Sequence, residues 1–287
     1  MKESIRITDI NPAPSASADG TSILTLPGGR IHGVEIVGTV AAAKMAAGFR
    51  DIRLLIGGNQ QRVSTLTQLS DAYSLYGPDF SVQNNVNSGP FRLLYMFTEN
   101  FRKQYTAAER FALDNPTDAN GVPLRDAQIE IDFLNTAAAK TLAFRAIVEP
   151  LNEVTDKQVH NALVKHFRKP YPITSDALFL NDLPRKDSYQ LIELYDPTGD
   201  EGIINEVKVK IDGKYRFHRT KAEQDQDLTR WGMEPREGVF SIVPDMFDNT
   251  ADAWNMQNVK EFIIEITCSV ACTGNVNVIS HRFGLPE

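Results

Sequence analysis

The chain has 287 residues, of which 42% are hydrophobic and 23% are charged, so it is long and apolar enough to bury two ordinary cores. Its formal net charge of −7 disfavours a protein that neutralises nucleic-acid phosphates over its whole surface. No apolar run reaches the roughly 18 residues of a membrane span, and the first 20 residues lack the apolar segment of a signal peptide, which predicts a chain kept in the cytoplasm of its producing cell unless it leaves by another route.

Residues 1–21 carry Pro12 and Pro14 among Ser, Ala and Asp, a composition typical of an arm without a core of its own. Short apolar runs separated by polar, turn-rich segments then continue to residue 150. The alternation of these runs predicts a β-sandwich over 22–150, with strands at 31–37, 52–56, 91–97, 127–134 and 142–148.

A strand, a turn and a helix are predicted together between Ile52 and Gly77. The run to Ile56 alternates apolar and charged residues, which is the pattern of a strand with one buried face. Gly57-Gly58 supplies the backbone freedom of a tight hairpin turn, and Thr65 with Gln68 forms a capping box that begins a helix ending at Gly77. A phosphate loop is the alternative, but neither Gly-Lys-Ser/Thr nor G-x-G-x-x-G is present there.

The same arrangement is repeated 155 residues later, which indicates a second copy of the sandwich over 170–287. The repeated pairs are Ile56 and Ile211, Gly58 and Gly213, Thr65 and Thr220, Gln68 and Glu223, and Gly77 and Gly232. Other strands recur with offsets between 157 and 135, as expected when two copies keep their strands and change their loops. A duplicated hairpin also disfavours the phosphate-loop alternative.

Residues 151–169 lie between the two predicted sandwiches. Val159, Leu163 and Phe167 are four residues apart, which predicts a connector helix. The segment also contains the basic residues Lys165, His166, Arg168 and Lys169. We interpret these as a solvated face, and we expect no sequence-specific binding of nucleic acid.

Catalytic patterns are missing from the sequence, so we predict no catalytic residues and no enzyme. Cys268 and Cys272 lie in an apolar strand-like run without an activating neighbour, and we expect buried free thiols rather than a disulfide. G-x-S-x-G and H-E-x-x-H do not occur, and the histidines are scattered, at His32, His160, His166, His218 and His281.

Two acidic loops could in principle offer oxygen ligands to calcium. One contains Asp114, Asp118 and Asn120, and the other contains Asp196, Asp200 and Glu201. Neither has the D-x-D-x-D-G spacing of a calcium loop, so we interpret both as turns and assign no metal or cofactor site.

Several of these segments together resemble a known family. Asp182-Leu183-Pro184-Arg185, the strand and turn from Val207 to Lys214, and the strand at 262–266 are similar to the second domain of the major capsid protein of corticovirus-type bacteriophages. Leu26-Pro27-Gly28-Gly29 and the segment from Asp51 to Tyr76 resemble its first domain. The resemblance extends from about residue 22 to residue 284.

The resemblance implies an all-β protein of two tandem eight-stranded jelly rolls, in the lineage of adenovirus hexon, with short helices in loops. Such proteins are homotrimers with a nearly hexagonal outline that tile an icosahedral virion shell around an internal membrane. The implied partners are neighbouring trimers, penton and spike proteins and that membrane, with assembly in the host cytoplasm. Some members bind structural calcium, but the resemblance assigns no ligand here, and the arm could lie against the membrane or a neighbouring trimer.

The alternative is a carbohydrate- or receptor-binding jelly roll, such as a lectin or spike. That function normally requires exposed aromatic side chains or a calcium loop. Trp231 and Trp254 are predicted at a helix end and beside a strand, where burial is expected. The sequence therefore favours a structural shell protein over a binding protein, and a binding protein over an enzyme.

Overall fold

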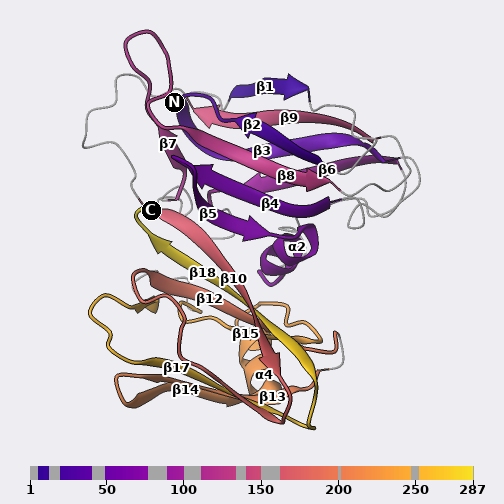
Figure 1. The fold of residues 1–287 in the computed structure, drawn as a ribbon, viewed down its shortest axis with the longest axis vertical. Coiled ribbons are helices and arrows are strands. Elements are labelled where there is room, and N and C mark those ends of the chain that lie inside the picture. The colour runs from indigo at the N-terminus through magenta and orange to yellow at the C-terminus, as the bar shows by residue number, and fades with distance from the viewer. Residues whose placement is uncertain are drawn as a thin grey trace. The chain divides into compact units, whose positions relative to one another are not determined.

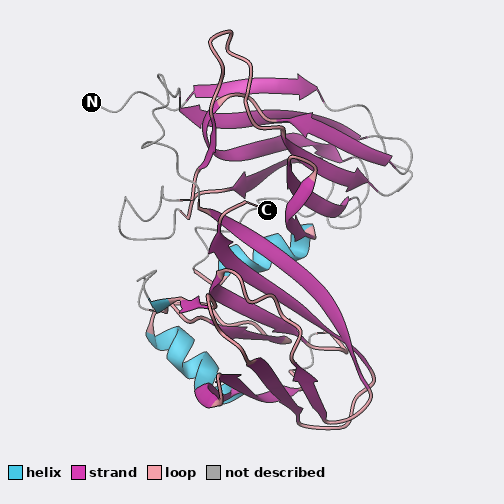
Figure 2. Cartoon of the chain, turned by 60° about the vertical axis from the view of Figure 1, so that its left-hand side comes forward, coloured by secondary structure: helices cyan, strands magenta, loops and turns pink. Residues whose placement is uncertain are grey.

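The computed structural model describes residues 6–12, 20–40, 49–76, 89–99, 111–133, 140–149, 162–199, 202–246 and 252–286. The chain divides into two compact units, of which the first holds residues 1–74, 78–164 and 285–287 and the second holds residues 75–77 and 165–284. Strands dominate both units, with a few short helices (Figures 1 and 2). This confirms the predicted all-β class with two tandem sandwiches.

The first unit contains two sheets. One has the strand order β1-β9-β3-β6, with β7 paired to β3, and the other has the order β2-β8-β4-β5. All of the pairings are antiparallel. The elements are β1 (Arg6–Pro12), β2 (Gly20–Thr25), β3 (Gly29–Val40), β4 (Phe49–Ile56), β5 (Asn59–Ser64), α2 (Leu66–Ser74), β6 (Gly89–Met96), β7 (Leu113–Asn115), β8 (Ala127–Phe133) and β9 (Lys140–Glu149).

The second unit repeats this order. One sheet is β10-β18-β12-β15, with β16 paired to β12, and the other is β11-β17-β13-β14. Each sheet of the second unit therefore has a counterpart in the first, strand by strand. The elements are β10 (Leu163–Ile173), β11 (Ala177–Leu180), β12 (Ser188–Tyr195), β13 (Ile204–Ile211), β14 (Lys214–Thr220), α4 (Lys221–Arg230), β15 (Val239–Ile242), β16 (Trp254–Asn255), β17 (Phe262–Cys268) and β18 (Gly274–Gly284).

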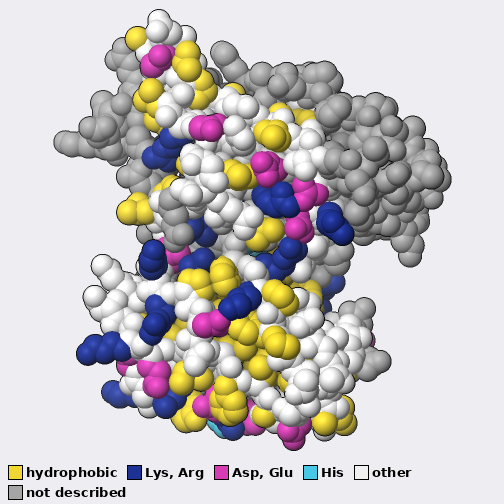
Figure 3. Space-filling model, viewed as in Figure 1, with side chains coloured by type: hydrophobic (Ala, Val, Ile, Leu, Met, Phe, Trp, Pro, Cys, Tyr) yellow, Lys and Arg dark blue, Asp and Glu magenta, His cyan; other side chains and the backbone are white. Residues whose placement is uncertain are grey.

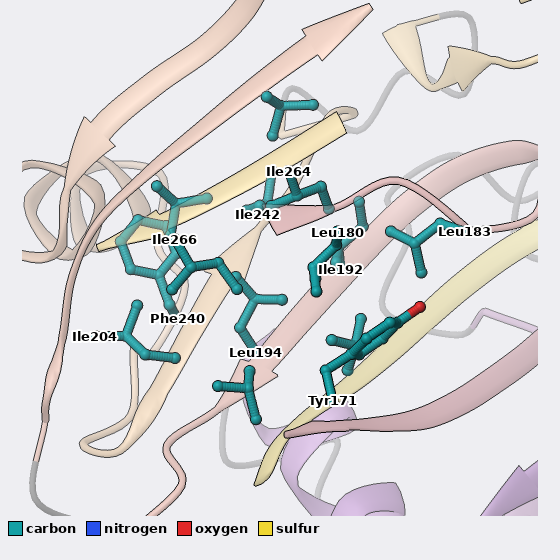
Figure 4. Packing of buried hydrophobic residues seen from close by; sticks show 14 of the residues in the cluster. Tyr171, Leu180, Leu183, Ile192, Leu194, Ile204, Phe240, Ile242, Ile264 and Ile266 are labelled. Carbon is teal, nitrogen blue, oxygen red and sulfur yellow. The ribbon is translucent and has the colours of Figure 1, made fainter. Parts of the chain in front are cut away.

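Each unit has its own hydrophobic core between its two sheets. In the second unit, Ile192 and Leu194 of β12 face Ile264 and Ile266 of β17, with Phe240 beside them (Figure 4). The five side chains are at most 1% exposed. Complete burial of an aliphatic or aromatic side chain contributes about 1.5–3 kcal/mol, so the alternation seen in the sequence holds the two layers together.

The two predicted hairpin turns are present. Gly57 and Gly58 join β4 to β5 with φ of 57° and 80°, and Asp212 and Gly213 join β13 to β14 with φ of 47° and 78°. Positive φ at both central residues is the requirement of a two-residue turn between twisted strands. At the second position, where φ is near 80°, a residue with a side chain is strained, which explains the repeated glycine; Asp212 at the first position of the second turn is of a type that tolerates positive φ.

The two capping boxes are also confirmed. The Thr65 Oγ1 accepts from the Gln68 N–H at 3.2 Å, and the Gln68 Oε1 accepts from the Thr65 N–H at 3.0 Å. Thr220 and Glu223 make the same reciprocal pair before α4. Gly232, with φ of 78°, follows the end of α4 as predicted, whereas Gly77 lies outside the described residues.

The predicted connector helix over 151–169 is wrong where the structure can test it. Residues from Leu163 onward form β10, which pairs with β18 at the edge of a sheet. A spacing of four places Leu163 and Phe167 on one side of a helix, but an even spacing also places them on one side of a strand. Residues 150–161, which include Val159, lie outside the described residues.

The predicted arm over 1–21 also needs correction. Residues Arg6–Pro12 form β1, which pairs with β9, and β2 begins at Gly20. Backbone pairing to an existing sheet orders β1 although its sequence has little apolar content of its own. Among the described residues, no helix is long and apolar enough to cross a membrane.

Candidate functional site

The first acidic loop uses its side chains within the fold. Asp114 is fully buried in β7 and accepts from the Arg30 guanidinium, with Nε–Oδ1 at 2.8 Å. The Asp118 Oδ1 accepts from the N–H groups of Asn120 and Val122 at 2.9 and 2.8 Å, which closes a turn. The prediction of turn residues is therefore confirmed for Asp118 and Asn120, whereas Asp114 lies in a strand.

The second acidic loop is organised by Asp196. Its Oδ2 accepts from the Ile203 N–H at 2.7 Å and its Oδ1 from the Ile204 N–H at 3.0 Å. Burial raises the pKa of Asp196 above its ordinary value, against the opposite effect of these hydrogen bonds. Asp200 and Glu201 lie outside the described residues. Within the described ranges, no group of three or more His, Cys, Asp or Glu side chains is placed to hold a metal ion.

Cys268 and Cys272 are both buried and both free thiols, as predicted. Their sulfur atoms are 3.7 Å apart. Burial raises the pKa of the Cys268 thiol to about 12, so the thiolate required of a nucleophile is disfavoured at neutral pH.

The structure brings together two histidines that are distant in the sequence. His166 of β10 and His281 of β18 have ring centroids 4.2 Å apart, and the His281 Nε2 lies 3.6 Å from a carboxylate oxygen of Glu193. His32 lies 3.5 Å from Glu149, and His218 pairs with Glu206, while His160 lies outside the described residues. No spacing in the sequence signals the His166–His281 contact, because β10 and β18 are the first and last strands of the second unit.

The basic segment at 165–169 is not a solvated face throughout. Lys165 and His166 are 3% and 5% exposed, and Lys165 pairs with the buried Asp187 at 3.0 Å. The Arg282 Nη1 donates to the same carboxylate oxygen at 2.8 Å. A buried charge needs partners, and this cluster of ion pairs joins β10, β18 and the residue before β12. On the face in Figure 3, basic and acidic side chains are interspersed.

The segment Asp182-Leu183-Pro184-Arg185, which is one of those that carry the family resemblance, has a structural role. Leu183 is buried, and the Tyr189 hydroxyl donates to the Pro184 carbonyl at 2.7 Å, which fixes the connection before β12. Asp182 accepts from the Lys169 ammonium and, at 2.5 Å, from the Tyr171 hydroxyl. The hydrogen bond from Lys169 lowers the pKa of Asp182 below its ordinary value.

Sequence reasoning missed the buried Arg62. This side chain in β5 is 1% exposed and donates to the backbone carbonyls of Met96 at 2.7 Å, Phe97 at 3.4 Å and Val164. Its guanidinium also lies 5.2 Å from the centre of the Phe97 ring. An arginine in an alternating strand ordinarily indicates the solvent face, so nothing local identifies it as buried.

The expected burial of both tryptophans is only partly right. Trp254 is partly buried and lies 6.5 Å from the Phe217 ring, whereas Trp231 is 50% exposed. Trp231 directly follows α4 as its C-cap residue.

The sequence of residues 166–284 matches the family model described as viral coat protein P2 C-terminal domain. No curated protein sequence matches the chain significantly. The family description is that of a coat protein, which supports a structural, non-enzymatic role and a location in the virion capsid.

Solved structures with the same fold match nearly the whole chain. The major capsid protein P2 from bacteriophage PM2 has a TM-score of 0.77 at 15% identity, covering 98% of this chain and 97% of that one. The PBCV-1 virus capsid protein has a TM-score of 0.70 at 10% identity, with 98% and 93% covered. The Faustovirus major capsid protein has a TM-score of 0.65 at 8% identity, with 100% and 92% covered. The chain therefore has the double jelly-roll fold of viral capsid proteins, and its residues 166–284 match the viral coat protein P2 C-terminal domain.

Proposed function

We infer that the chain is a major capsid protein whose homotrimers tile an icosahedral virion shell around an internal membrane. The observation that carries this inference is the combination of a coat-protein family match over 166–284 with a second sandwich of the same strand order in the first unit. Two similar sandwiches per chain give six around a three-fold axis. Such a trimer can pack in hexagonal surroundings with three chains instead of six.

The proposal includes neighbouring trimers as partners in the virion, together with penton and spike proteins and the internal membrane. Assembly would take place in the host cytoplasm. No catalytic residue, cofactor or sequence-specific contact with nucleic acid is part of it. Structural calcium stays a prediction without an assigned site, and thermal unfolding with and without a chelator tests for it.

Sedimentation of the purified protein at micromolar concentration tests the proposed function. A trimer has a mass of about 96 kDa, three times the 32.0 kDa chain. Obligate interfaces bury on the order of 2,000–5,000 Å² and are apolar, so dilution should lower the apparent stability. Trimers that add into sheets or shells support the proposal, whereas a stable, folded monomer with no trimer contradicts it.

A carbohydrate- or receptor-binding role is the second candidate, and the half-exposed Trp231 is the observation that favours it. An exposed indole can stack on a sugar ring, but one aromatic side chain does not by itself make a site. Specific glycan-array binding by the purified protein, abolished in Trp231→Ala, would support this role. Unchanged binding in that variant, or none in the original protein, excludes Trp231 as a glycan site.

A further inference from the structure

The two cysteines of the chain lie together where β17 leads into β18. Cys268 is the last residue of β17, and Cys272 lies in the connection before β18 begins at Gly274. Both belong to the hydrophobic core cluster of the second unit, and their sulfur atoms are 3.7 Å apart. The two thiols are thus neighbours inside the fold and not only in the sequence.

Backbone hydrogen bonds hold both cysteines against one turn, which precedes β11. The Cys268 N–H donates to the Asp176 carbonyl at 2.7 Å. The Cys272 N–H donates to the neighbouring Ser175 carbonyl at 3.3 Å, and the Cys272 sulfur lies 3.6 Å from the same oxygen. Because neighbouring Cα atoms along a chain are about 3.8 Å apart, attachment to consecutive residues keeps the two cysteine backbones close to each other.

The distance between the two sulfur atoms suits the formation of a disulfide. Bonded sulfur atoms are about 2 Å apart, so an approach of roughly 1.7 Å, by rotation about the two Cα–Cβ bonds, would join them. A thiol is a weak hydrogen-bond donor and a weak acceptor, so little is given up when the contact between the thiols becomes a covalent bond.

We propose that Cys268 and Cys272 are a redox-sensitive pair, which stays reduced in the producing cell and becomes an intrachain disulfide once the assembled particle is outside it. The cytoplasm keeps thiols reduced, whereas disulfides persist in oxidising surroundings. The timing rests on the proposed function, because a virion protein that assembles in the cytoplasm meets both conditions in turn. The formation of the bond in the purified protein does not depend on that function.

The oxidant is a low-molecular-weight disulfide such as oxidised glutathione. The Cys272 thiol loses its proton and attacks one sulfur of the oxidant, which releases the other half as a thiol. The Cys268 thiol then loses its proton and attacks the Cys272 sulfur, which forms the protein disulfide and releases the second half of the oxidant. Two protein thiols are oxidised and one small disulfide is reduced to two thiols, so atoms and electrons balance.

The order of attack follows from the surroundings of the two thiols. Cys272 is 9% exposed and Cys268 is 5% exposed. Burial raises the pKa of the Cys268 thiol, and the adjacent Cys272 thiol and the carboxylates of Asp196 and Asp176 raise it further. These features disfavour Cys268 as the first nucleophile and assign the first attack to Cys272. The bonded sulfur atoms carry no charge, so burial does not oppose the oxidised form.

Thiol counting in the purified full-length protein tests the bond. The protein is equilibrated with oxidised glutathione at room temperature and again just below its melting temperature, where local opening admits the oxidant. The reaction is stopped with acid, and free thiols are alkylated in denaturant and counted by intact mass. We expect both thiols to be lost together, with a mass lower by two hydrogen atoms and no intermolecular product on a non-reducing gel.

Three results would overturn the inference. They are two stable glutathione adducts on one chain, disulfide-linked dimers, and two free thiols at both temperatures. Oxidation should also raise the melting temperature of the protein, because an intrachain bond restricts the unfolded chain. A bond that forms without raising the melting temperature would contradict a stabilising role.

Single alanine variants are matched controls for the two steps. Cys268→Ala keeps the first nucleophile and should accumulate one glutathione adduct. Cys272→Ala keeps only the more buried thiol and should form its adduct at least about ten-fold more slowly, because its reactive thiolate is rarer. Neither variant can close the bond, so the melting temperature of Cys272→Ala should not respond to brief oxidation. A faster adduct in Cys272→Ala than in Cys268→Ala would overturn the order of attack.

Alkylation before and after particle release separates this inference from the proposed function. Thiols are blocked in intact producing cells and, separately, in particles collected from the medium without reductant. Free thiols in cells and the disulfide in particles would support both proposals. Particles with free thiols would reject the timing and leave the capsid proposal standing. The absence of particles that contain the chain would reject the capsid proposal and the timing that rests on it, whereas thiol counting in the purified protein still decides whether the bond forms.

Discussion

The strands β5 and β14 occupy equivalent positions in the two units, but they differ in the chemistry of one inward side chain. Arg62 of β5 pairs with Leu54, and Phe217 of β14 pairs with Val209, so the two side chains hold equivalent inward positions. Phe217 packs against Phe240 and Trp254, with ring centroids 6.2 and 6.5 Å away. Arg62 instead donates to three backbone carbonyls.

This difference shows that duplication preserves the backbone more strictly than the chemistry of the core. An aromatic side chain gains stability from apolar area, whereas a buried guanidinium must satisfy its charge and its donors. In the first unit those donors hold the end of β6 through the carbonyls of Met96 and Phe97, and Tyr73 donates to the Met96 carbonyl as well, at 2.9 Å. The pKa of Tyr73 is raised to about 12 by burial, so its hydroxyl keeps its proton.

Replacement of Arg62 is expected to have the largest effect. Arg62→Met leaves three backbone carbonyls without their donors and should lower the free energy of unfolding by about 3–5 kcal/mol. Phe217→Leu, a change of shape in an apolar cluster, should cost about 1 kcal/mol. Urea denaturation at one fixed protein concentration measures both, with the exposed Arg216→Met as the control. Equal losses at the two positions would contradict the difference in chemistry.

The hairpin turns are expected to respond alike. Gly58→Ala and Gly213→Ala each place a side chain at a φ near 80°, which should cost about 1–2 kcal/mol. Neither added Cβ would meet an atom within 4 Å, so the cost comes from the backbone alone. Thermal unfolding of the two variants checks this. An unchanged melting temperature in either variant would contradict this expectation and would show that the turn at that position can adopt another type.

The capping threonines should give smaller and similar losses. Thr65→Ala and Thr220→Ala each remove the acceptor of one helix N–H, which costs about 1 kcal/mol. Thr65→Ser and Thr220→Ser keep that acceptor and are the matched controls. Denaturation curves in which the serine variants are as unstable as the alanine variants would assign the loss to packing rather than capping.

The smallest effect concerns Asp182, which stands where the first unit has Thr25. The pKa of Asp182 is lowered below its ordinary value of 3.8, mainly by the hydrogen bond from Lys169. Stability from this carboxylate is therefore present above pH 3.8 and is lost as the pH falls through the lower pKa of the folded state. The pair is nearly half exposed, so Asp182→Asn should cost only about 0.5 kcal/mol at pH 7. Melting temperatures of both proteins from pH 7 down to pH 3 should converge at the acid end, and a constant gap would contradict this account.

The regular parts of the fold could be predicted from the sequence. Alternating runs such as 52–56 and 207–211, with a glycine turn and a capping threonine, specify their structure within a few residues. The connector helix failed because an even spacing of apolar residues fits a strand as well as a helix. β1 was missed because pairing to β9, a contact across more than 130 residues, orders it.

The buried polar groups could not be predicted from the sequence. Arg62, Lys165 and His166 are polar residues that ordinarily lie at the surface, and each becomes buried through contacts with distant segments. The turn at Asp118 was interpreted correctly, because this side chain closes its own turn within four residues. Side chains that act locally can thus be assigned from sequence, and those that act between strands cannot.

Electron microscopy of the purified, soluble protein tests the central claim most directly. Class averages viewed down the symmetry axis should contain particles with three-fold symmetry and six similar lobes, two from each chain, because the two units share one strand order. Particles with only two lobes at micromolar concentration, without trimers or larger assemblies, would contradict the account.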